Sequence, residues 1–238
     1  MLKLSPVVKY AIYLKSFIDL IFPRNCWGCR SLLQVYEKCL CLHCQLDLPI
    51  TNFHKTHKNP LYEKLKKTIP IKSASSLFYF NKEGIASKLI HQFKYLDQQK
   101  IGVYLGEWLG EVLKENTQIK EAEGIIPVPL HPAKQKKRGY NQAEIIGMSL
   151  SKKLQIPLYN NLVVRVKNTK ALASIGYEKR KEEIHQAFDL KVPFEEPLSH
   201  LLLVDDVITT GATITSCAKA LLKNKGIQLS IVSLACRV

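Results

Sequence analysis

Thirteen residues near the C-terminus, LLLVDDVITTGAT at positions 201–213, constrain the fold of this chain more than any other segment. Its four leading apolar residues predict a short buried strand that ends at Asp205 and Asp206. The run Thr-Thr-Gly-Ala-Thr that closes the segment then opens a helical pattern over 214–225. In an open α/β sheet, ligands bind outside the carboxyl ends of the strands, and a small-residue turn that opens a helix points its amides at an anion. The segment therefore predicts recognition of a phosphorylated ribose, with the paired carboxylates serving its vicinal hydroxyls or a divalent cation.

The order of these positions, an apolar strand, two acidic residues and then T-T-G-x-T, resembles a known loop. It is the loop that binds phosphoribosyl pyrophosphate (PRPP) in type I phosphoribosyltransferases. The alternative is an ordinary strand–helix junction that happens to be rich in Thr and Gly. That alternative is the weaker one, because so many constrained positions match together.

The composition indicates a folded protein with anionic ligands. The 238 residues, 46% of them hydrophobic, suffice for one substantial α/β domain and a smaller module. Lysine and arginine number 35 against 20 for aspartate and glutamate, a formal net charge of +15. Such an excess favours polyanionic partners, here PRPP, nucleic acid or an anionic membrane surface. Charge alone does not choose among them, since basic surfaces are common in proteins that bind no polymer.

The N-terminal segment, residues 1–22, is expected to form a helix. Its apolar run is interrupted by Lys9, Lys15 and Asp19, and no stretch of the chain reaches the roughly 20 apolar residues of a membrane span. No signal-peptide cleavage pattern follows it, so we expect a cytoplasmic protein. The apolar face of this helix could rest on a membrane, which would make the protein membrane-peripheral. Packing on the protein's own body is the stronger interpretation.

Five of the seven cysteines lie between positions 26 and 44. Two C-x2-C pairs, Cys26 with Cys29 and Cys41 with Cys44, have the spacing of two zinc knuckles that each supply two thiolates. A disulfide framework fits a reducing cytosol poorly, and two pairs at this spacing favour structural zinc over a redox motif. Cys39 lies two residues before Cys41 and could replace it as a ligand, so both are candidates.

The rest of the chain alternates predicted strands with predicted helices. Strands are expected over 76–80, 124–128, 162–166, 201–204 and 229–235. Helices are expected over 61–68, 84–93 and 102–116, and the basic run 134–142 is expected to open a further helix through Leu154. This alternation indicates a doubly wound, mainly parallel α/β sheet. We divide the chain into an N-terminal helix (1–22), a four-cysteine zinc module (23–50), a connector (51–75) and a phosphoribosyltransferase-like domain (76–238).

Several landmarks occur in an order that resembles one bacterial family. They are the two cysteine pairs, Phe93-Lys94-Tyr95, Pro127-Val-Pro-Leu-His131, Arg138-Gly-Tyr-Asn-Gln142 and the PRPP loop. Over nearly the whole chain, this order resembles the ComF family of phosphoribosyltransferase-like proteins. The resemblance implies a small zinc module on a type I phosphoribosyltransferase fold. It also implies an association with natural competence, in which incoming single-stranded DNA is handled on the cytoplasmic side of the membrane.

The resemblance also assigns roles to residues. Asp205 and Asp206 would hold the ribose hydroxyls, and the residues after them would cradle the 5-phosphate. Leu130 and His131 match a turn that contacts pyrophosphate, and Arg138 is placed as a phosphate-binding cation. The alternatives are that His131 only caps a turn and that Arg138 belongs to a solvated basic face. The PRPP-binding set is thus Leu130, Val204, Asp205, Asp206, Thr209, Thr210, Gly211, Ala212 and Thr213, and the catalytic set is Asp205, Asp206, His131 and Arg138.

A mobile loop is expected after the predicted strand 162–166, where a lid would exclude water and supply charge to departing pyrophosphate. Here the chain departs from the family pattern, because Leu172 and Glu183 stand where the family usually has Gln and Asn. This departure affects recognition of the second substrate more than PRPP binding. The loop residues that we single out are Arg165, Lys167, Thr169, Lys170 and Arg180.

Two functions from different classes follow. The first is a phosphoribosyltransferase in which PRPP, with Mg²⁺, transfers its ribosyl group from pyrophosphate to a nucleophile that the sequence does not identify. The second is a nucleic-acid-binding competence factor that keeps the fold without turnover and acts with DNA-uptake proteins at the inner face of the membrane. Its single-stranded DNA contacts, steeply salt-dependent, would be Lys134, Lys136, Lys137 and Tyr140.

Overall fold

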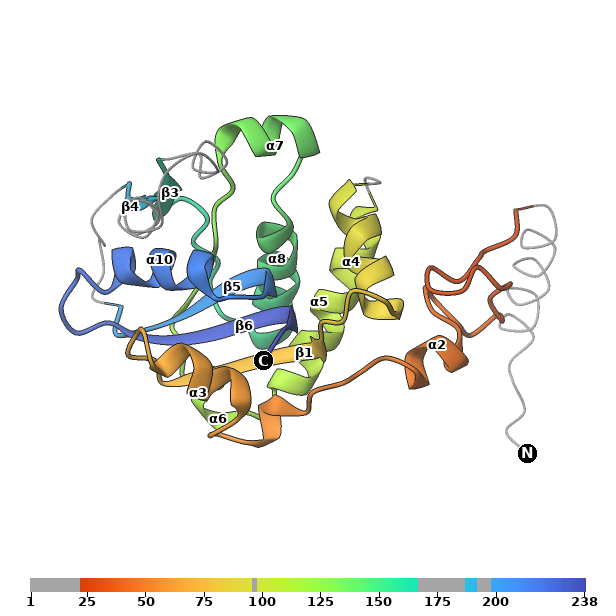
Figure 1. Cartoon of the computed structure of the whole chain (residues 1–238), viewed down its shortest axis with the longest axis horizontal. Helices are drawn as coiled ribbons and strands as arrows, with labels where there is room; N and C mark the ends of the chain where they lie inside the picture. Colours follow the sequence, from red (N-terminus) through yellow and green to blue (C-terminus); the bar gives the residue numbers. More distant parts are fainter. Residues whose placement is uncertain (1–21, 96–97, 167–186, 192–197) are drawn as a thin grey trace.

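A four-stranded sheet forms the centre of the computed structural model, which describes residues 22–95, 98–166, 187–191 and 198–238 (Figure 1). The strand order is β1-β6-β5-β2, and every pairing in this sheet is parallel. Parallel strands place their carboxyl ends along a single edge, where α/β proteins bind their ligands. The four strands are β1 (Ser73–Tyr79), β2 (Gly124–Pro127), β5 (His200–Ile208) and β6 (Gln228–Cys236).

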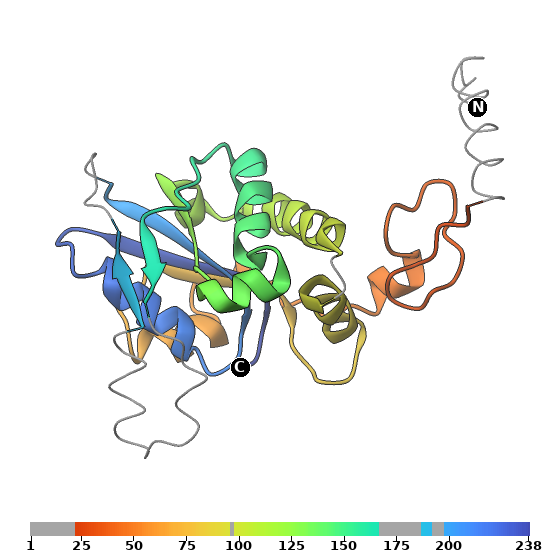
Figure 2. The ribbon, with the colours of Figure 1, turned by 90° about the horizontal axis from the view of Figure 1, so that it is seen from above.

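Helices cover both faces of this sheet (Figure 2). Successive residues of β5 point to opposite faces, so Leu201 and Leu203 pack into one apolar cluster and Leu202 and Val204 into the other. All four are fully buried, which explains their continuous apolar run. The predicted α/β class with a doubly wound, parallel sheet is confirmed. One face carries α3 (Pro60–Lys66) and α10 (Ala212–Leu221), and the other carries α4 (Ile85–Tyr95), α5 (Gln99–Leu113) and α8 (Gln142–Leu154).

The strand β5 runs further than the sequence predicts. We expected it to end at Val204, but its pairing with β6 continues to Ile208. On its other side, β5 pairs with β2 only as far as Val204, which lies opposite Pro127. The long partner β6 supplies backbone hydrogen bonds beyond the end of β2, so Asp205 and Asp206 lie within the strand rather than after it. Among the described residues, this end of β5 is paired on one side only.

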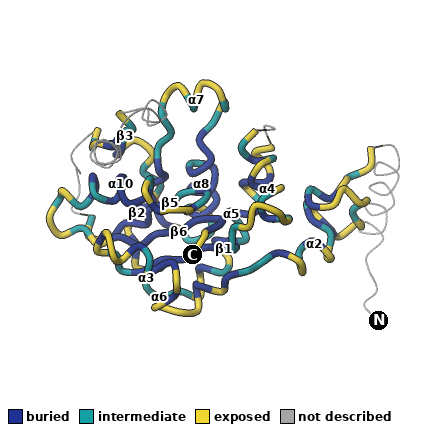
Figure 3. Tube along the Cα trace, in the orientation of Figure 1, coloured by how far each residue is buried: buried dark blue, intermediate teal, exposed yellow. Residues whose placement is uncertain are grey.

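The basic segment after β2 forms two helices where one was expected. Helix α7 (Pro132–Arg138) ends at Gly139, whose backbone is left-handed with a φ of 80°. Asn141 then caps α8, since its side chain accepts a hydrogen bond of 3.1 Å from the amide of Ala143. The helix that was expected through Leu154 is α8, and α7 is an additional helix that the sequence analysis did not predict. Most of α7 is exposed, as Figure 3 shows.

A second sheet of two strands lies apart from the first. The strand expected over 162–166 is β3 (Val163–Arg165), which pairs antiparallel with β4 (Phe188–Leu190) and does not join the parallel sheet. Val163 and Phe188 are buried in the apolar cluster that includes α10, so this small sheet packs against the helix that follows β5. The remaining described elements are α2 (Leu42–Leu46), the 3-10 helix η1 (Phe53–Lys55) and α6 (Thr117–Lys120).

The cysteine-rich segment packs on α4 and α5. Leu40 and Cys44 are fully buried in the apolar cluster that contains these helices. The rings of Trp27 and Tyr104 meet edge to face with centroids 6.5 Å apart. Gln92 Nε2 donates a hydrogen bond of 2.8 Å to the carbonyl of Trp27. The segment is thus fixed to the body of the protein through one face of the helical layer.

Several expectations about the early part of the chain lie outside the structure. Residues 1–21 are not among the described ones, so the helix expected over 1–22 and the division of the chain into four parts stay predictions. Helix α3, which we placed in the connector, packs on the central sheet, with Leu61 and Leu65 almost fully buried. In the part of the chain that the structure describes, no helix is both long and apolar enough to cross a membrane.

Candidate functional site

Two adjacent carboxylates lie toward the carboxyl end of β5. Asp206 is buried and Asp205 is half-buried. The amide of Asp206 donates a hydrogen bond of 2.8 Å to Oδ1 of Asp205, and Lys94 Nζ lies 2.8 Å from Oδ2 of Asp206. Burial, followed by repulsion from Asp206, raises the pKa of the Asp205 carboxyl to about 7. Two carboxylates held this close suit a bound divalent cation or the hydroxyls of a sugar.

A guanidinium group on β3 lies within electrostatic reach of this pair. Burial lowers the pKa of Arg165, and attraction to Asp205 opposes that effect. The guanidinium carbon lies 5.2 Å from the centre of the Phe188 ring, which holds the side chain in place. We placed Arg165 at the start of a mobile loop, and the structure brings it toward the carboxylates. The other singled-out positions lie outside the described residues, namely Lys167, Thr169, Lys170, Leu172, Arg180 and Glu183.

The turn after β5 has the form of an anion cradle. Gly211 is buried with a φ of 83°, a left-handed conformation that favours glycine. The Thr210 hydroxyl accepts a hydrogen bond of 3.3 Å from the amide of Ala212, the first residue of α10. First-turn amides of a helix have no intrahelical acceptor, so the amides that follow Ala212 in this turn are suited to an anion. Asp205 and residues 207–214 line one pocket, which joins the Asp205 carboxylate to the cradle.

Helix α3 supports this turn from an early part of the chain. Lys64 Nζ donates hydrogen bonds of 2.6 Å to the carbonyl of Thr209 and 2.5 Å to the carbonyl of Arg237. A Cβ atom at Gly211 would lie 3.0 Å from Leu65 Cδ2, so the helix leaves little room for a larger residue. The sequence analysis missed Lys64, because its partners are backbone carbonyls that only folding brings close.

The turn after β2 lies at the same edge as the carboxylates. The Val128 amide donates a hydrogen bond of 2.8 Å to the carbonyl of Val204, and Leu130 and His131 follow directly. His131 Nδ1 accepts a hydrogen bond of 3.2 Å from the Ala133 amide and so caps α7. This is the capping contact that the sequence left open as the alternative role of His131.

A cluster of cations lies where the end of α4 meets α7. Arg138 Nη1 donates a hydrogen bond of 3.1 Å to Gln142 Oε1, and Nη2 donates one of 3.5 Å to the Tyr95 hydroxyl. The guanidinium carbon lies 5.2 Å from the centre of the Tyr95 ring, so Arg138 is held against α4. The residues that line the pocket between the two helices are Lys94, Tyr95, Lys134, Lys136, Lys137, Arg138 and Gly139.

Lys94 is the charged residue at the carboxylates that the sequence analysis missed. Phe93-Lys94-Tyr95 served only as a family landmark, although Lys94 pairs with Asp206. The Tyr140 hydroxyl donates to the Phe93 carbonyl, and the two rings have centroids 5.9 Å apart. Tyr140, which we named as a base-stacking candidate, is therefore engaged in packing against α4. Tyr95, with 60% of its surface exposed, is the aromatic residue that lines the same pocket as the candidate DNA-binding lysines.

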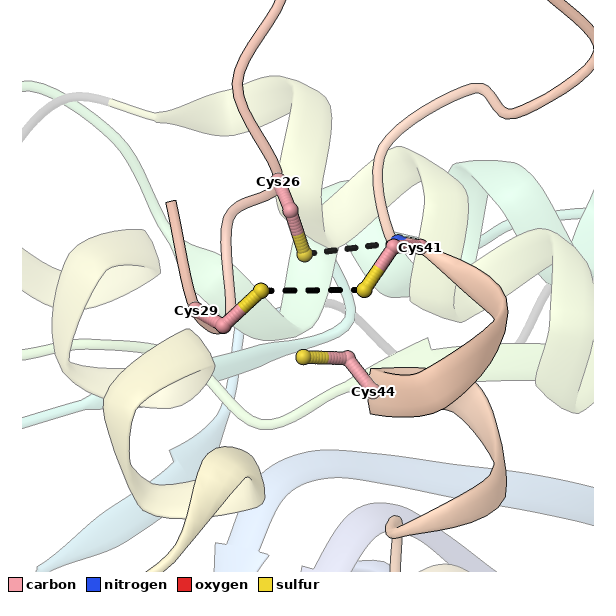
Figure 4. Close-up of side chains that lie close together, drawn as sticks. All are labelled: Cys26, Cys29, Cys41 and Cys44. Carbon is pink, nitrogen blue, oxygen red and sulfur yellow. Dashed lines mark hydrogen bonds between the residues drawn. The ribbon is translucent and has the colours of Figure 1, made fainter. Parts of the chain in front are cut away.

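The four cysteines of the two C-x2-C pairs converge (Figure 4). The Sγ atoms of Cys26, Cys29, Cys41 and Cys44 all lie within 4.8 Å of one another, and those of Cys29 and Cys41 are 3.6 Å apart. Four thiolates about 2.3 Å from a central zinc would stand about 3.8 Å apart, so the group fits a tetrahedral metal. Cys39 lies outside the group and lines a separate pocket against α5. The arrangement favours Cys41 over Cys39 as a ligand.

Comparison with known proteins identifies the family. No protein-family model matches the chain. It is 40% identical over 146 residues to Competence protein F of Haemophilus influenzae, a match that covers 60% of this chain and 63%, less than two thirds, of that protein. It is 30% identical over 220 residues to DNA utilization protein YhgH of Shigella flexneri, which covers 86% of this chain and 93% of that protein. The chain belongs to the ComF family.

Solved structures similar to this ComF family member are phosphoribosyltransferases. Orotate phosphoribosyltransferase from Aeropyrum pernix is 16% identical, with a TM-score of 0.34, and the match covers 72% of this chain and 77% of that one. Adenine phosphoribosyltransferase from Leishmania tarentolae is 13% identical, with a TM-score of 0.31, and covers 75% and 88%. TM-scores this low add nothing to the family assignment. The assignment rests on the sequence matches alone.

Proposed function

We propose that this ComF family member binds PRPP together with Mg²⁺ where Asp205 and Asp206 meet the turn 209–213. The observation that carries the proposal is that a carboxylate and an anion cradle line one pocket. The carboxylates would accept hydrogen bonds from the ribose hydroxyls, and the amides and hydroxyls of the turn would hold the 5-phosphate. Oxygen donors such as these two carboxylates fit Mg²⁺, which would neutralise pyrophosphate charge when bound.

If the protein turns PRPP over, the ribosyl C1–oxygen bond breaks and pyrophosphate leaves with the electron pair, while a nucleophile forms the new bond at C1. The residues of this chain would act by position and charge. The cradle at 209–213 would fix the ribose, and His131 and Arg138 would face the departing pyrophosphate. Arg165 would add positive charge near Asp205. Either carboxylate would serve as an acceptor for the hydroxyls rather than as a nucleophile.

The second candidate function is single-stranded DNA binding without turnover. It is supported by the cations gathered around α7 and by relatives named Competence protein F and DNA utilization protein YhgH. In this role the protein would act with DNA-uptake proteins at the inner face of the membrane, and zinc on the four cysteines would be structural. Binding to phosphates through lysines would weaken steeply as salt rises.

Titration calorimetry of PRPP with Mg²⁺ into the purified protein tests the first function. We expect micromolar binding by the wild type and no detectable binding by Asp205→Asn with Asp206→Asn. The matched control, Asp47→Asn with Glu83→Gln, removes two exposed negative charges elsewhere and should bind like the wild type. Equal affinity in the Asp205/Asp206 variant and the wild type would contradict the assignment.

A further inference from the structure

The pocket between the end of α4 and α7, here called the α4–α7 pocket, has the make-up of a polyanion site. Its volume is about 760 Å³, which is within the range of ligand pockets. Five of its lining residues carry positive charge and one is aromatic, and no acidic residue is among those that line it. The lining residues are Lys94, Tyr95, Lys134, Lys136, Lys137, Arg138 and Gly139.

The arrangement of these charges indicates a chain of phosphates rather than one compact anion. Lys136 and Lys137 lie on the exposed last turn of α7, and Arg138 is held against the Tyr95 ring. Separate ammonium groups along a short helix suit the spaced phosphates of a backbone, whereas a single phosphate is bound by converging donors. The exposed Tyr95 ring adds a surface on which an unpaired base can stack.

Lys94 belongs to this pocket and to the neighbouring carboxylate site at once. Its Nζ lies 2.8 Å from Asp206 Oδ2, and its side chain is about one fifth exposed. It also lines the α4–α7 pocket. The Lys94 ammonium group therefore lies between the carboxylates and the α4–α7 pocket, and Arg138, proposed above to face pyrophosphate, also lines this pocket.

We propose that the α4–α7 pocket binds the backbone of a single-stranded nucleic acid, and that Lys94 couples this binding to the PRPP site. The pocket deepens the second candidate function, and the coupling rests in addition on the proposed PRPP-binding function. PRPP brings a pyrophosphate whose negative charge draws Lys94 away from a strand in the pocket and repels that strand. Each ligand therefore weakens the other, and by linkage the two effects are equal in size.

The pocket is tested first without PRPP, by fluorescence anisotropy of a labelled oligo(dT) of about 20 nucleotides. Lys136→Gln with Lys137→Gln should weaken binding at least about tenfold at low salt and reduce the slope against log salt by about 1.4, at about 0.7 per phosphate contact. The matched control, Lys223→Gln with Lys225→Gln, removes the same charge from exposed positions beyond the C-terminal end of α10. If both variants lost the same oligo(dT) affinity, the α4–α7 pocket would not be the nucleic-acid site.

The coupling is tested by repeating the wild-type titration with saturating Mg²⁺–PRPP. We expect the oligo(dT) Kd to rise at least about threefold, an effect that Lys94→Met should reduce and Lys94→Arg should retain. Arg138 accounts for the coupling that remains in Lys94→Met. Coupling that persists unchanged in Lys94→Met would overturn the role of Lys94. If calorimetry detects no PRPP binding, the proposed function and the coupling both fail, whereas the pocket is judged by the first experiment alone.

Discussion

In the cysteine module, four thiols converge from one stretch between Cys26 and Cys44, whereas the groups around Asp205 come from distant parts of the chain. Lys94 is on α4, Arg165 is on β3, and Lys64 supports the cradle from α3. Four thiols this close together could hold a metal ion, and we expect the shape of the module to depend on that ligand. The sheet edge is held by β6, α3 and α10, so it is formed before any ligand arrives.

The comparison predicts that the two regions respond differently to the loss of one group. A substitution among the thiols should remove both the metal and the local fold. A substitution at the sheet edge should reduce binding and leave the fold largely intact.

Removal of one thiol should have the largest effect. Cys41→Ser should lose its zinc and unfold the module, because structural zinc contributes on the order of 10 kcal/mol in small zinc sites. Cys39→Ser is the matched control and should keep its zinc, since Cys39 lies outside the converging group. Metal analysis of the purified variants measures this. Zinc lost from Cys39→Ser and kept in Cys41→Ser would move the ligand to Cys39.

A methyl group added to the cradle should be less damaging. Gly211→Ala imposes a left-handed φ on alanine, at a cost of about 1 kcal/mol, and presses its Cβ on Leu65 Cδ2 at 3.0 Å. We expect Tm to fall by at least about 2–4 °C, with weaker PRPP binding. Gly226→Ala is the control, because its φ of 91° gives similar strain with no atom within 4 Å of the added Cβ. Equal Tm losses and unchanged PRPP affinity in both variants would show that the turn 209–213 does not bind PRPP.

Removal of the support under the cradle should have a smaller effect. Lys64→Met breaks the hydrogen bonds to the carbonyls of Thr209 and Arg237, a loss of about 1 kcal/mol at this exposed position. PRPP affinity should fall about fivefold, because 1 kcal/mol corresponds to about that factor. Lys66→Met, on the same helix, should bind PRPP like the wild type in calorimetry. If the two variants behaved alike, α3 would have no part in positioning the cradle.

The pH dependence should be the most modest signal. Since the pKa of Asp205 is raised in the folded protein, the native state holds a proton that the unfolded state has lost between about pH 4 and pH 7. The free energy of unfolding therefore falls as pH rises through this window. Asp205→Asn removes the effect, so its Tm relative to the wild type should be higher at pH 8 than at pH 5. A Tm difference that is the same at both pH values would contradict the raised pKa.

A rise in pH should strengthen PRPP binding, although it lowers the free energy of unfolding. A deprotonated carboxylate accepts hydrogen bonds from hydroxyls and binds cations, so PRPP affinity in the presence of Mg²⁺ should increase from pH 6 to pH 8. Calorimetry at the two pH values measures this, after correction for the ionisation of PRPP itself. Affinity that falls over this range would mean that the protonated form of Asp205 is the one that binds.

Much of the fold could be predicted because local patterns decide it. The continuous apolar run 201–204 correctly indicated a strand buried on both faces, and the alternation of elements indicated a parallel sheet. The end of β5 could not be predicted, because it depends on the length of its partner β6. Helix α7 had local signals in Pro132 at its first residue and Gly139 at its end, which the basic run between them obscured.

The candidate site was predictable where its residues are adjacent in sequence. The spacing of the cysteine pairs indicated a metal site, and the order of acidic and small residues indicated the carboxylates beside the cradle. Lys94 and Lys64 could not be found in this way, because an ammonium group on a helix carries no sign of its partner. Their roles follow only from the topology that brings α4 and α3 beside the end of β5.

Amide hydrogen exchange with and without Mg²⁺–PRPP tests the central claim most directly, since it reports both regions in one experiment. We predict slower exchange at amides of residues 209–214 when PRPP binds, and unchanged exchange between Cys26 and Cys44. Unchanged exchange at 209–214 under saturating PRPP, or protection confined to the cysteine module, would contradict the claim that this edge of the sheet is the phosphoribosyl site.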